Sequence, residues 1–238
     1  MELTNEQQSL RRVVVTGAAG ALGSKVLEHF VDAGCTVVGI DRNFAGNELV
    51  RHKELHRLHL LGCDLTHADA VQGAFEHIKS SLGGIDALIH CAGGFRFTPA
   101  HETITDDIDF LVDLNLKSSL IATREALKAM KASGFGRIIL VSSASALKPG
   151  FGVSSYVASK AGLHAFIESV AAEVKDEDIN IHAVAPGMID TEANRKQMPD
   201  ADFSKWVSPN ALAEIIFLLT QPTMNAVRRC VLPVTGGQ

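Results

Sequence analysis

The chain contains a single tyrosine, Tyr156, which is followed four residues later by Lys160. Residues four apart on a helix share one face, so the Lys160 ammonium is predicted to lie over the same surface as the phenol. A nearby cation stabilises a phenolate and is expected to lower the phenol pKa from about 10. Tyr156 is therefore a candidate proton donor to a forming alkoxide. Taken alone, the pair is better explained as a half-buried tyrosine beside a solvated lysine.

Two further polar residues stand where they could join this pair. Ser143 directly follows an apolar stretch predicted to be a strand, so its hydroxyl can point into a crevice at the strand end. Asn115 falls inside a long predicted helix, where asparagine is a mildly poor helix former and requires another reason for its presence. Together the four side chains could supply a proton donor, a second hydroxyl donor, a cation and an amide.

A glycine-rich segment, TGAAGALG, follows the first predicted strand and leads into a helix. Glycines at such a turn let the backbone approach a pyrophosphate, while the helix N-terminus favours negative charge. Its place before a second strand favours binding over a purely structural turn. The residues expected to contact a dinucleotide here are Gly17, Gly20, Ala21, Leu22 and Gly23.

The second predicted strand ends in Asp41-Arg42. A carboxylate at this position can accept hydrogen bonds from an adenosine ribose and repels a 2′-phosphate. Arg42 is a complication, because a guanidinium can tolerate that phosphate. We therefore expect NAD(H), with NADP(H) as the second possibility. Candidate cofactor contacts after the third and fourth strands are Asp64, Leu65, Ala92, Gly93 and Gly94.

Strand-like apolar runs alternate with longer helical patterns along the chain. Such alternation predicts a doubly wound α/β domain, with about seven parallel strands and helices on both faces. The predicted strands are Arg12–Thr16, Thr36–Asp41, Arg57–Gly62, Asp86–Cys91, Arg137–Ser142, Ile179–Ala185 and Arg229–Val234. The predicted helices are Ala21–Ala33, Ala68–Ser81, Asp106–Ala132, Ser155–Lys175 and Pro209–Thr220, with a short one possible between Asn43 and His56.

Composition limits the classes of function. The 238 residues are 46% hydrophobic and 21% charged, with a formal net charge of −5, so a packed domain is expected and a nucleic-acid partner is not. We expect residues 1–10 to be flexible and residues 11–238 to form one domain. The four scattered cysteines, the acidic start and the lack of a long apolar run predict a cytoplasmic protein without metal site or membrane association.

The combined spacing of Asn115, Ser143, Tyr156 and Lys160 resembles that of the short-chain dehydrogenase/reductase family, from about residue 11 to residue 237. This resemblance implies that Tyr156 is the acid/base, Ser143 holds the carbonyl oxygen, Lys160 binds the nicotinamide ribose and Asn115 anchors a proton-relaying water. It also implies that the nicotinamide carboxamide meets the segment after the sixth strand. The residues concerned there are Pro186, Gly187, Ile189 and Thr191.

Within that family, the stretch from Asn194 to Trp206 and other short segments resemble the dihydropteridine reductases. These typically carry alanine at the position of Ser143, which favours a carbonyl or alcohol substrate here over a quinonoid pterin. A third possibility is a dinucleotide-sensing regulator without turnover. Family resemblance further implies a homodimer or homotetramer built on the two long helices. An apolar pocket that accepts a ring is predicted from Phe95, Phe97, Met188, Met198 and Trp206.

Overall fold

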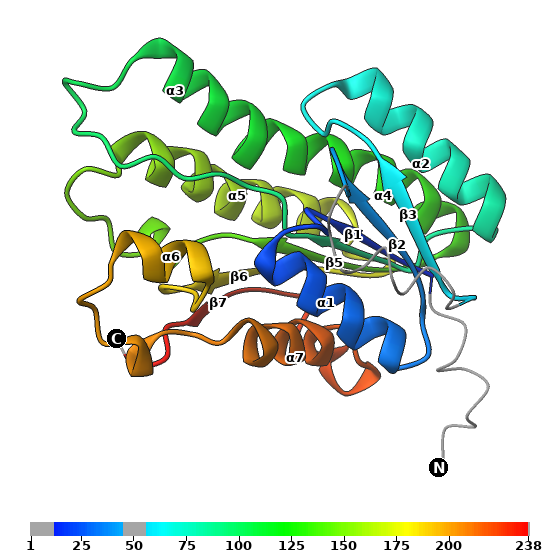
Figure 1. The fold of residues 1–238 in the computed structure, drawn as a ribbon. Coiled ribbons are helices and arrows are strands. Elements are labelled where there is room, and N and C mark those ends of the chain that lie inside the picture. The colour runs from blue at the N-terminus through cyan, green and yellow to red at the C-terminus, as the bar shows by residue number, and fades with distance from the viewer. Residues whose placement is uncertain (1–11, 45–55, 238) are drawn as a thin grey trace.

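The computed structural model describes residues 12–44 and 56–237. Seven parallel strands form one sheet in the order β3-β2-β1-β4-β5-β6-β7 (Figure 1). Their bounds are β1 Arg12–Thr16, β2 Thr36–Asp41, β3 Leu58–Gly62, β4 Ala87–His90, β5 Phe135–Val141, β6 Asp178–Pro186 and β7 Arg229–Val234. The predicted doubly wound fold is confirmed, and β1, β2 and β7 coincide with the predicted ranges. The possible helix between Asn43 and His56 falls mostly outside the described residues.

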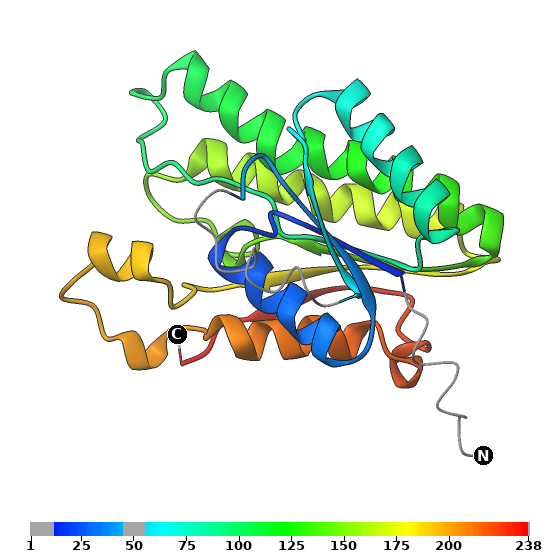
Figure 2. The same ribbon diagram turned by 45° about the vertical axis from the view of Figure 1, so that its right-hand side comes forward.

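Helices cover both faces of the sheet (Figures 1 and 2). On one face, α1 (Ala21–Asp32) and α7 (Pro209–Leu219) pack side by side. On the other face lie α2 (Ala68–Leu82), α4 (Ser118–Ser133) and α5 (Ser154–Glu173). The short α3 (Thr105–Leu111) precedes α4, and α6 (Glu192–Gln197) follows β6. Helix α6 was not predicted from the sequence, since its six residues bury no apolar side chain.

Alternate residues of each strand face the two helical layers, which is why the strands read as continuous apolar runs. On β1, Val13 and Val15 face α1 and α7, whereas Val14 faces the layer of α2, α4 and α5. Phe30 of α1 is fully buried and meets Phe217 of α7 edge-on, with ring centroids 5.2 Å apart. Burying such a side chain contributes about 1.5–3 kcal/mol.

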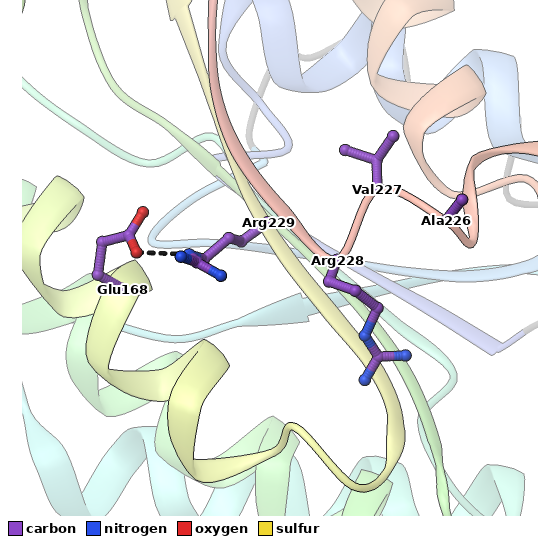
Figure 3. Close-up of a pocket in the computed structure, with 5 residues that line it drawn as sticks. All are labelled: Glu168, Ala226, Val227, Arg228 and Arg229. Carbon is purple, nitrogen blue, oxygen red and sulfur yellow. Dashed lines mark hydrogen bonds and ion pairs between the residues drawn. The ribbon is translucent and has the colours of Figure 1, made fainter.

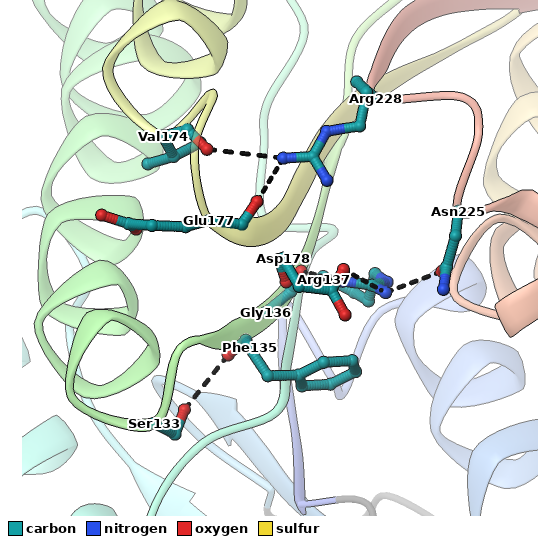
Figure 4. Close-up of polar contacts among 9 residues, drawn as sticks. All are labelled: Ser133, Phe135, Gly136, Arg137, Val174, Glu177, Asp178, Asn225 and Arg228. Carbon is teal, nitrogen blue, oxygen red and sulfur yellow. Dashed lines mark hydrogen bonds and ion pairs between the residues drawn. The ribbon is translucent and has the colours of Figure 1, made fainter.

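Polar contacts close the sheet at the end where β5, β6 and β7 begin (Figure 4). The buried Arg137 guanidinium donates to Asp178 Oδ1 at 2.9 Å and to Asn225 Oδ1 at 2.7 Å. Nearby, Arg228 donates to the carbonyls of Val174 and Glu177, just past the end of α5. These bonds hold together the starts of β5, β6 and β7. The carboxyl ends of the strands lie at the opposite edge of the sheet.

One surface hollow, of about 570 Å³, lies beside the start of β7 (Figure 3). Arg229 pairs there with Glu168 across the opening. None of the residues that line this hollow is a predicted site residue, so the candidate site must be sought at the carboxyl ends of the strands, where ligands bind in open α/β sheets. The lining residues are Glu168, Ala226, Val227, Arg228 and Arg229.

Candidate active site

The glycine turn after β1 has no room for side chains. Gly17 has φ +66°, and a Cβ there would lie 2.7 Å from the backbone nitrogen of Ala92. A Cβ on Gly23 would lie 2.0 Å from the Gly17 carbonyl oxygen. Helix α1 begins at Ala21 with Gly20 as its N-cap, and no side chain caps its first amides. The turn therefore forms a close backbone cradle at a helix N-terminus that no side chain caps, which suits a pyrophosphate.

Asp41, at the end of β2, lies against this cradle. Its Oδ2 accepts a hydrogen bond from the Ala19 amide at 3.0 Å, and its Oδ1 accepts one from the Arg42 amide at 2.7 Å. Arg42 itself is exposed. A carboxylate is thus fixed beside the glycine turn, where the sequence placed the ribose of the cofactor.

Asp64 lies just after β3, and its carboxylate accepts hydrogen bonds from the nearby residue Thr66. Its Oδ1 accepts hydrogen bonds from the Thr66 amide at 2.9 Å and the Thr66 hydroxyl at 2.7 Å, which lower the Asp64 pKa. The neighbouring Leu65 is buried. Asp64 and Leu65 thus lie after the third strand, where cofactor contacts were predicted. The hydrogen bonds of Asp64 also stabilise the turn that leads into α2.

Asn115 lies in a π-helical turn, Val112–Lys117, that joins α3 to α4. The single helix predicted over Asp106–Ala132 is therefore interrupted, as π-helical turns often are at functional sites. The Asn115 side chain is fully buried and pairs with the backbone of Gly94. A Cβ on Gly93 would lie 2.9 Å from Asn115 Oδ1 and 3.0 Å from Lys160 Nζ. Glycine is therefore required where the loop after β4 passes these two side chains.

Lys160 lies one turn beyond Tyr156 on α5, and its side chain is buried. Its ammonium donates a 2.8 Å hydrogen bond to the carbonyl of Val141, the last residue of β5. Burial lowers the Lys160 pKa to about 8, and the nearby Cys91 side chain partly opposes this shift. Lys160 is thereby held at the carboxyl end of the sheet as a desolvated cation.

The phenol of Tyr156 behaves differently from the expectation. Burial raises its pKa above the usual value, and the side-chain hydrogen bond with Ser143 offsets only part of the increase. The predicted lowering by Lys160 is wrong for this structure, because the ammonium is bonded to the Val141 carbonyl and burial outweighs any cationic effect. Tyr156 is consequently a protonated group at neutral pH and can donate a hydrogen bond to a substrate oxygen.

Ser142 and Ser143 directly follow β5, and their hydroxyls have different partners. Ser143 is buried, interacts with Tyr156, and accepts a hydrogen bond from the Ser145 amide at 3.2 Å. Ser142 Oγ lies 2.8 Å from Nε2 of His164, one turn past Lys160 on α5. This contact ties α5 to the end of β5.

The segment after β6 was expected to meet the nicotinamide, and its polar groups have partners within the chain. Gly187 donates its amide to Val234 at 2.9 Å, immediately after Pro186. The Ile189 carbonyl accepts from Asn194 Nδ2 at 2.8 Å. The Thr191 hydroxyl caps α6 by accepting from the Asn194 amide at 3.1 Å. Asn194 was not predicted as a site residue, and it occupies the acceptors of this segment.

Of the aromatic residues assigned to the predicted ring-accepting pocket, Phe95 lies next to Tyr156, whereas Phe97 and Trp206 contact other rings. Phe95 meets the Tyr156 ring edge-on, with centroids 4.9 Å apart. Phe97 meets Phe151, which the sequence interpretation missed because it lies far from Phe97 along the chain. Trp206, also assigned to the predicted pocket, packs on Phe203 with ring centroids 4.7 Å apart.

The parallel sheet, the glycine cradle, the half-buried tyrosine and the buried serine and lysine define a dinucleotide-dependent oxidoreductase. The sequence profile of the short chain dehydrogenase family matches residues 11–202. The chain belongs to this family and is a dehydrogenase/reductase enzyme, and members of the family use NAD(H) or NADP(H).

Individual relatives extend over most of the chain. It is 32% identical to the 3-oxoacyl-[acyl-carrier-protein] reductase of Bos taurus, over 94% of this chain and 95% of the relative. Carbonyl reductase family member 4 of Xenopus laevis is 31% identical over 94% and 95%. The acetoacetyl-CoA reductase of Cupriavidus necator is 32% identical over 76% of both chains. The solved structure described as "Crystal structure of gox2181" matches with a TM-score of 0.87, 25% identity and 95% coverage of both chains.

No helix among residues 12–44 and 56–237 is both long enough and apolar enough to cross a membrane.

Proposed function

We propose that the chain catalyses NAD(H)-dependent hydride transfer between nicotinamide and a carbonyl or alcohol substrate, with Tyr156 as the acid/base. The observation that carries the proposal is the convergence of Tyr156, Ser143 and Lys160 at the carboxyl end of β5. Two hydroxyls in mutual contact and a desolvated ammonium can stabilise charge that develops on one oxygen.

The residues of the cradle fit a dinucleotide. The glycines let the backbone come close where a Cβ would clash, and the N-terminus of α1, which no side chain caps, favours a negatively charged group. Asp41 would accept hydrogen bonds from the hydroxyls of the adenosine ribose. When bound, the cofactor supplies or accepts the hydride. The choice of NAD(H) over NADP(H) rests on the Asp41 carboxylate, which would repel a 2′-phosphate.

Four side chains would supply the proton to the substrate oxygen, stabilise the negative charge that develops on it, and position the cofactor. Tyr156 would donate its phenolic proton to the substrate oxygen during reduction. Ser143 would donate a second hydrogen bond to the same oxygen. Lys160, buried next to the strand end, would contribute positive charge and contact the ribose. Asn115 would hold the loop after β4, and through it the edge of the cofactor site.

The test is turnover by the purified protein, with NADH and NADPH compared against ketones, aldehydes and a quinonoid dihydropterin. We expect NADH oxidation with at least one carbonyl compound. The dihydropteridine reductase interpretation is the second candidate, supported by the sequence likeness between Asn194 and Trp206, and it predicts that the pterin is the best substrate. Cofactor binding without turnover of any compound would instead support a dinucleotide-sensing regulator.

We also propose a homodimer or homotetramer formed through the long helices. An exposed apolar pair at the start of the predicted long helix Asp106–Ala132 supports this: Ile108 of α3 and Val112 of the π-helical turn, four residues apart, are each 40% exposed. Residues so spaced share one helix face. Light scattering of the wild type and of Ile108→Glu would test it, with dissociation expected in the variant. A wild-type monomer at micromolar concentration would contradict it.

A further inference from the structure

Three exposed phenylalanines lie on two loops, after β4 and before α5, and one of them, Phe95, contacts the candidate catalytic tyrosine. Phe95 is 48% exposed, Phe97 is 62% exposed and Phe151 is 79% exposed. Phe95 contacts the Tyr156 ring, and Phe97 and Phe151 contact each other with centroids 6.3 Å apart. Single apolar residues on a surface are ordinary, whereas a group of them next to polar reactive side chains is typical of a ligand site.

The two loops that carry these rings are fastened together. The Thr98 amide donates a 2.7 Å hydrogen bond to the Gly152 carbonyl, which joins the loop after β4 to the loop before α5. Gly152 has φ +73°, and a Cβ there would lie 2.6 Å from the Phe97 ring. Glycine therefore lets the second loop pass directly against Phe97. Because the loops are already ordered, a ligand can bind the rings without the cost of fixing them.

The loop after β4 is also held on its other side, by α3. Arg96 lies between two of its phenylalanines in the sequence, but its guanidinium is 4.1 Å from the Phe110 ring centroid and pairs with Asp107 at 2.9 Å. Its charge is thus neutralised by α3. What the loop presents beside Tyr156 is aromatic surface, which suits an uncharged ring better than a phosphate-bearing carrier.

We propose that the substrate carries an aromatic ring next to its reacting carbonyl or alcohol carbon, and that Phe95 and Phe151 bind this ring. The inference rests on the proposed function, since the reacting oxygen is placed at Tyr156. Phe95 touches that phenol, so a group attached to the reacting carbon falls against Phe95. Aromatic rings pair well edge-on or offset-stacked, which a saturated ring cannot reproduce.

The experiment compares acetophenone with cyclohexyl methyl ketone, which has the same carbon skeleton with a saturated ring. The quantity measured is the ratio of their kcat/KM values in the wild type, in Phe95→Leu and in Phe151→Leu. Leucine keeps an apolar side chain and removes the aromatic face. We expect each variant to lower the acetophenone preference at least fivefold. Phe135→Leu makes the same change at the opposite end of the sheet, and its ratio should equal that of the wild type.

Folding of each variant is checked by its melting temperature and its NADH affinity, which exposed positions should preserve. Unchanged ratios in both Phe95→Leu and Phe151→Leu, with either ketone turned over, would overturn the aromatic site and leave the proposed function standing. So would a kcat/KM for acetoacetyl-CoA that exceeds both ketones and is insensitive to the two variants. Failure to reduce any carbonyl compound would overturn the proposed function, and the substrate assignment with it.

Discussion

The side-chain amide of Asn115 forms two hydrogen bonds with the backbone of Gly94. Its Oδ1 accepts from the Gly94 amide at 2.8 Å, and its Nδ2 donates to the Gly94 carbonyl at 3.0 Å. Nδ2 also donates to Ser159 Oγ at 3.0 Å, and Ser159 Oγ donates to the Tyr156 carbonyl at 2.7 Å. One buried amide thus connects the loop after β4 to the helix that carries the tyrosine and lysine.

This arrangement predicts that Asn115→Leu destabilises the fold. Leucine has a similar size, but it leaves the partly buried Gly94 amide and carbonyl without their side-chain partner, and an unpaired polar group shielded from water costs about 1–3 kcal/mol. We expect the free energy of unfolding, measured in urea, to fall by about 2–4 kcal/mol. Asp113→Asn is the control, because Asp113 is in the same π-helical turn with an exposed partner, Lys117. A loss below about 0.5 kcal/mol for Asn115→Leu would contradict the prediction.

Tyr156→Phe is expected to remove most turnover while NADH affinity changes by only a few fold. The phenol acts on the proton of the substrate, whereas cofactor affinity comes mainly from the glycine turn and Asp41. Loss of a positioned acid costs on the order of 10²–10⁴ in rate. Steady-state kcat and NADH titration by fluorescence would check both parts. If the variant kept most of the wild-type kcat, the proton would have to come from another group.

Asp41 should determine the choice of cofactor. Asp41→Asn removes the charge that repels a 2′-phosphate but keeps an acceptor for the Ala19 amide, so the glycine turn should survive. We expect the ratio of kcat/KM for NADPH to that for NADH to rise at least tenfold. Adding Arg42→Ala should reverse part of that gain, since the guanidinium would then be absent. If the wild type already preferred NADPH, Asp41 would not be the residue that determines the choice of cofactor.

The sequence was sufficient to predict the fold and to place the candidate site residues after the ends of the strands, because both depend on local patterns. Strand burial on both faces gives continuous apolar runs, and the glycine turn has its own spacing. The sequence could not predict that the Lys160 ammonium binds the Val141 carbonyl, or that burial raises the Tyr156 pKa. Those properties depend on which groups surround a side chain in three dimensions.

The same reason explains the residues that were missed. Phe151 meets Phe97 only because Gly152 allows two distant loops to pass closely. Helix α6 is too short to show an apolar period, and it is stabilised by the Thr191 cap instead. Asn115 was noticed as unusual for a helix, but nothing in the sequence distinguishes a π-helical turn from an ordinary one.

Two buried histidines should make the stability depend on pH. Burial is the main cause that lowers the pKa of His90 to about 3 and that of His182 to about 4, below their ordinary 6.5. The unfolded chain therefore binds more protons below pH 6.5, and stability present above that pH is lost as the pH falls toward these values. From pH 6 to pH 5, we expect the unfolding free energy to fall by about 2–3 kcal/mol, from roughly 1.4 kcal/mol per histidine and pH unit.

Urea titrations at the two pH values measure this loss. His90 is bonded through both ring nitrogens, to Thr16 Oγ1 at 2.8 Å and Ser118 Oγ at 3.1 Å, so His90→Asn should lower the overall stability but also flatten the pH dependence. His101→Asn is the matched control, because the His101 side chain is 81% exposed and should not alter the slope. Equal slopes in His90→Asn and the wild type would show that His90 is not the group that titrates.

Ser143→Ala separates the two candidate substrates. A ketone develops localised charge on one oxygen during reduction, which Tyr156 and Ser143 would share. Loss of one such donor costs about 2.7–4 kcal/mol, or roughly 10²–10³ in kcat. A quinonoid pterin spreads the incoming charge over several heteroatoms, so the serine would be nearly dispensable. The measurement is the kcat of Ser143→Ala on the best substrate found, with Ser145→Ala as the neighbouring control. A fall of less than about tenfold, together with efficient pterin reduction, would replace the carbonyl assignment with the pteridine one.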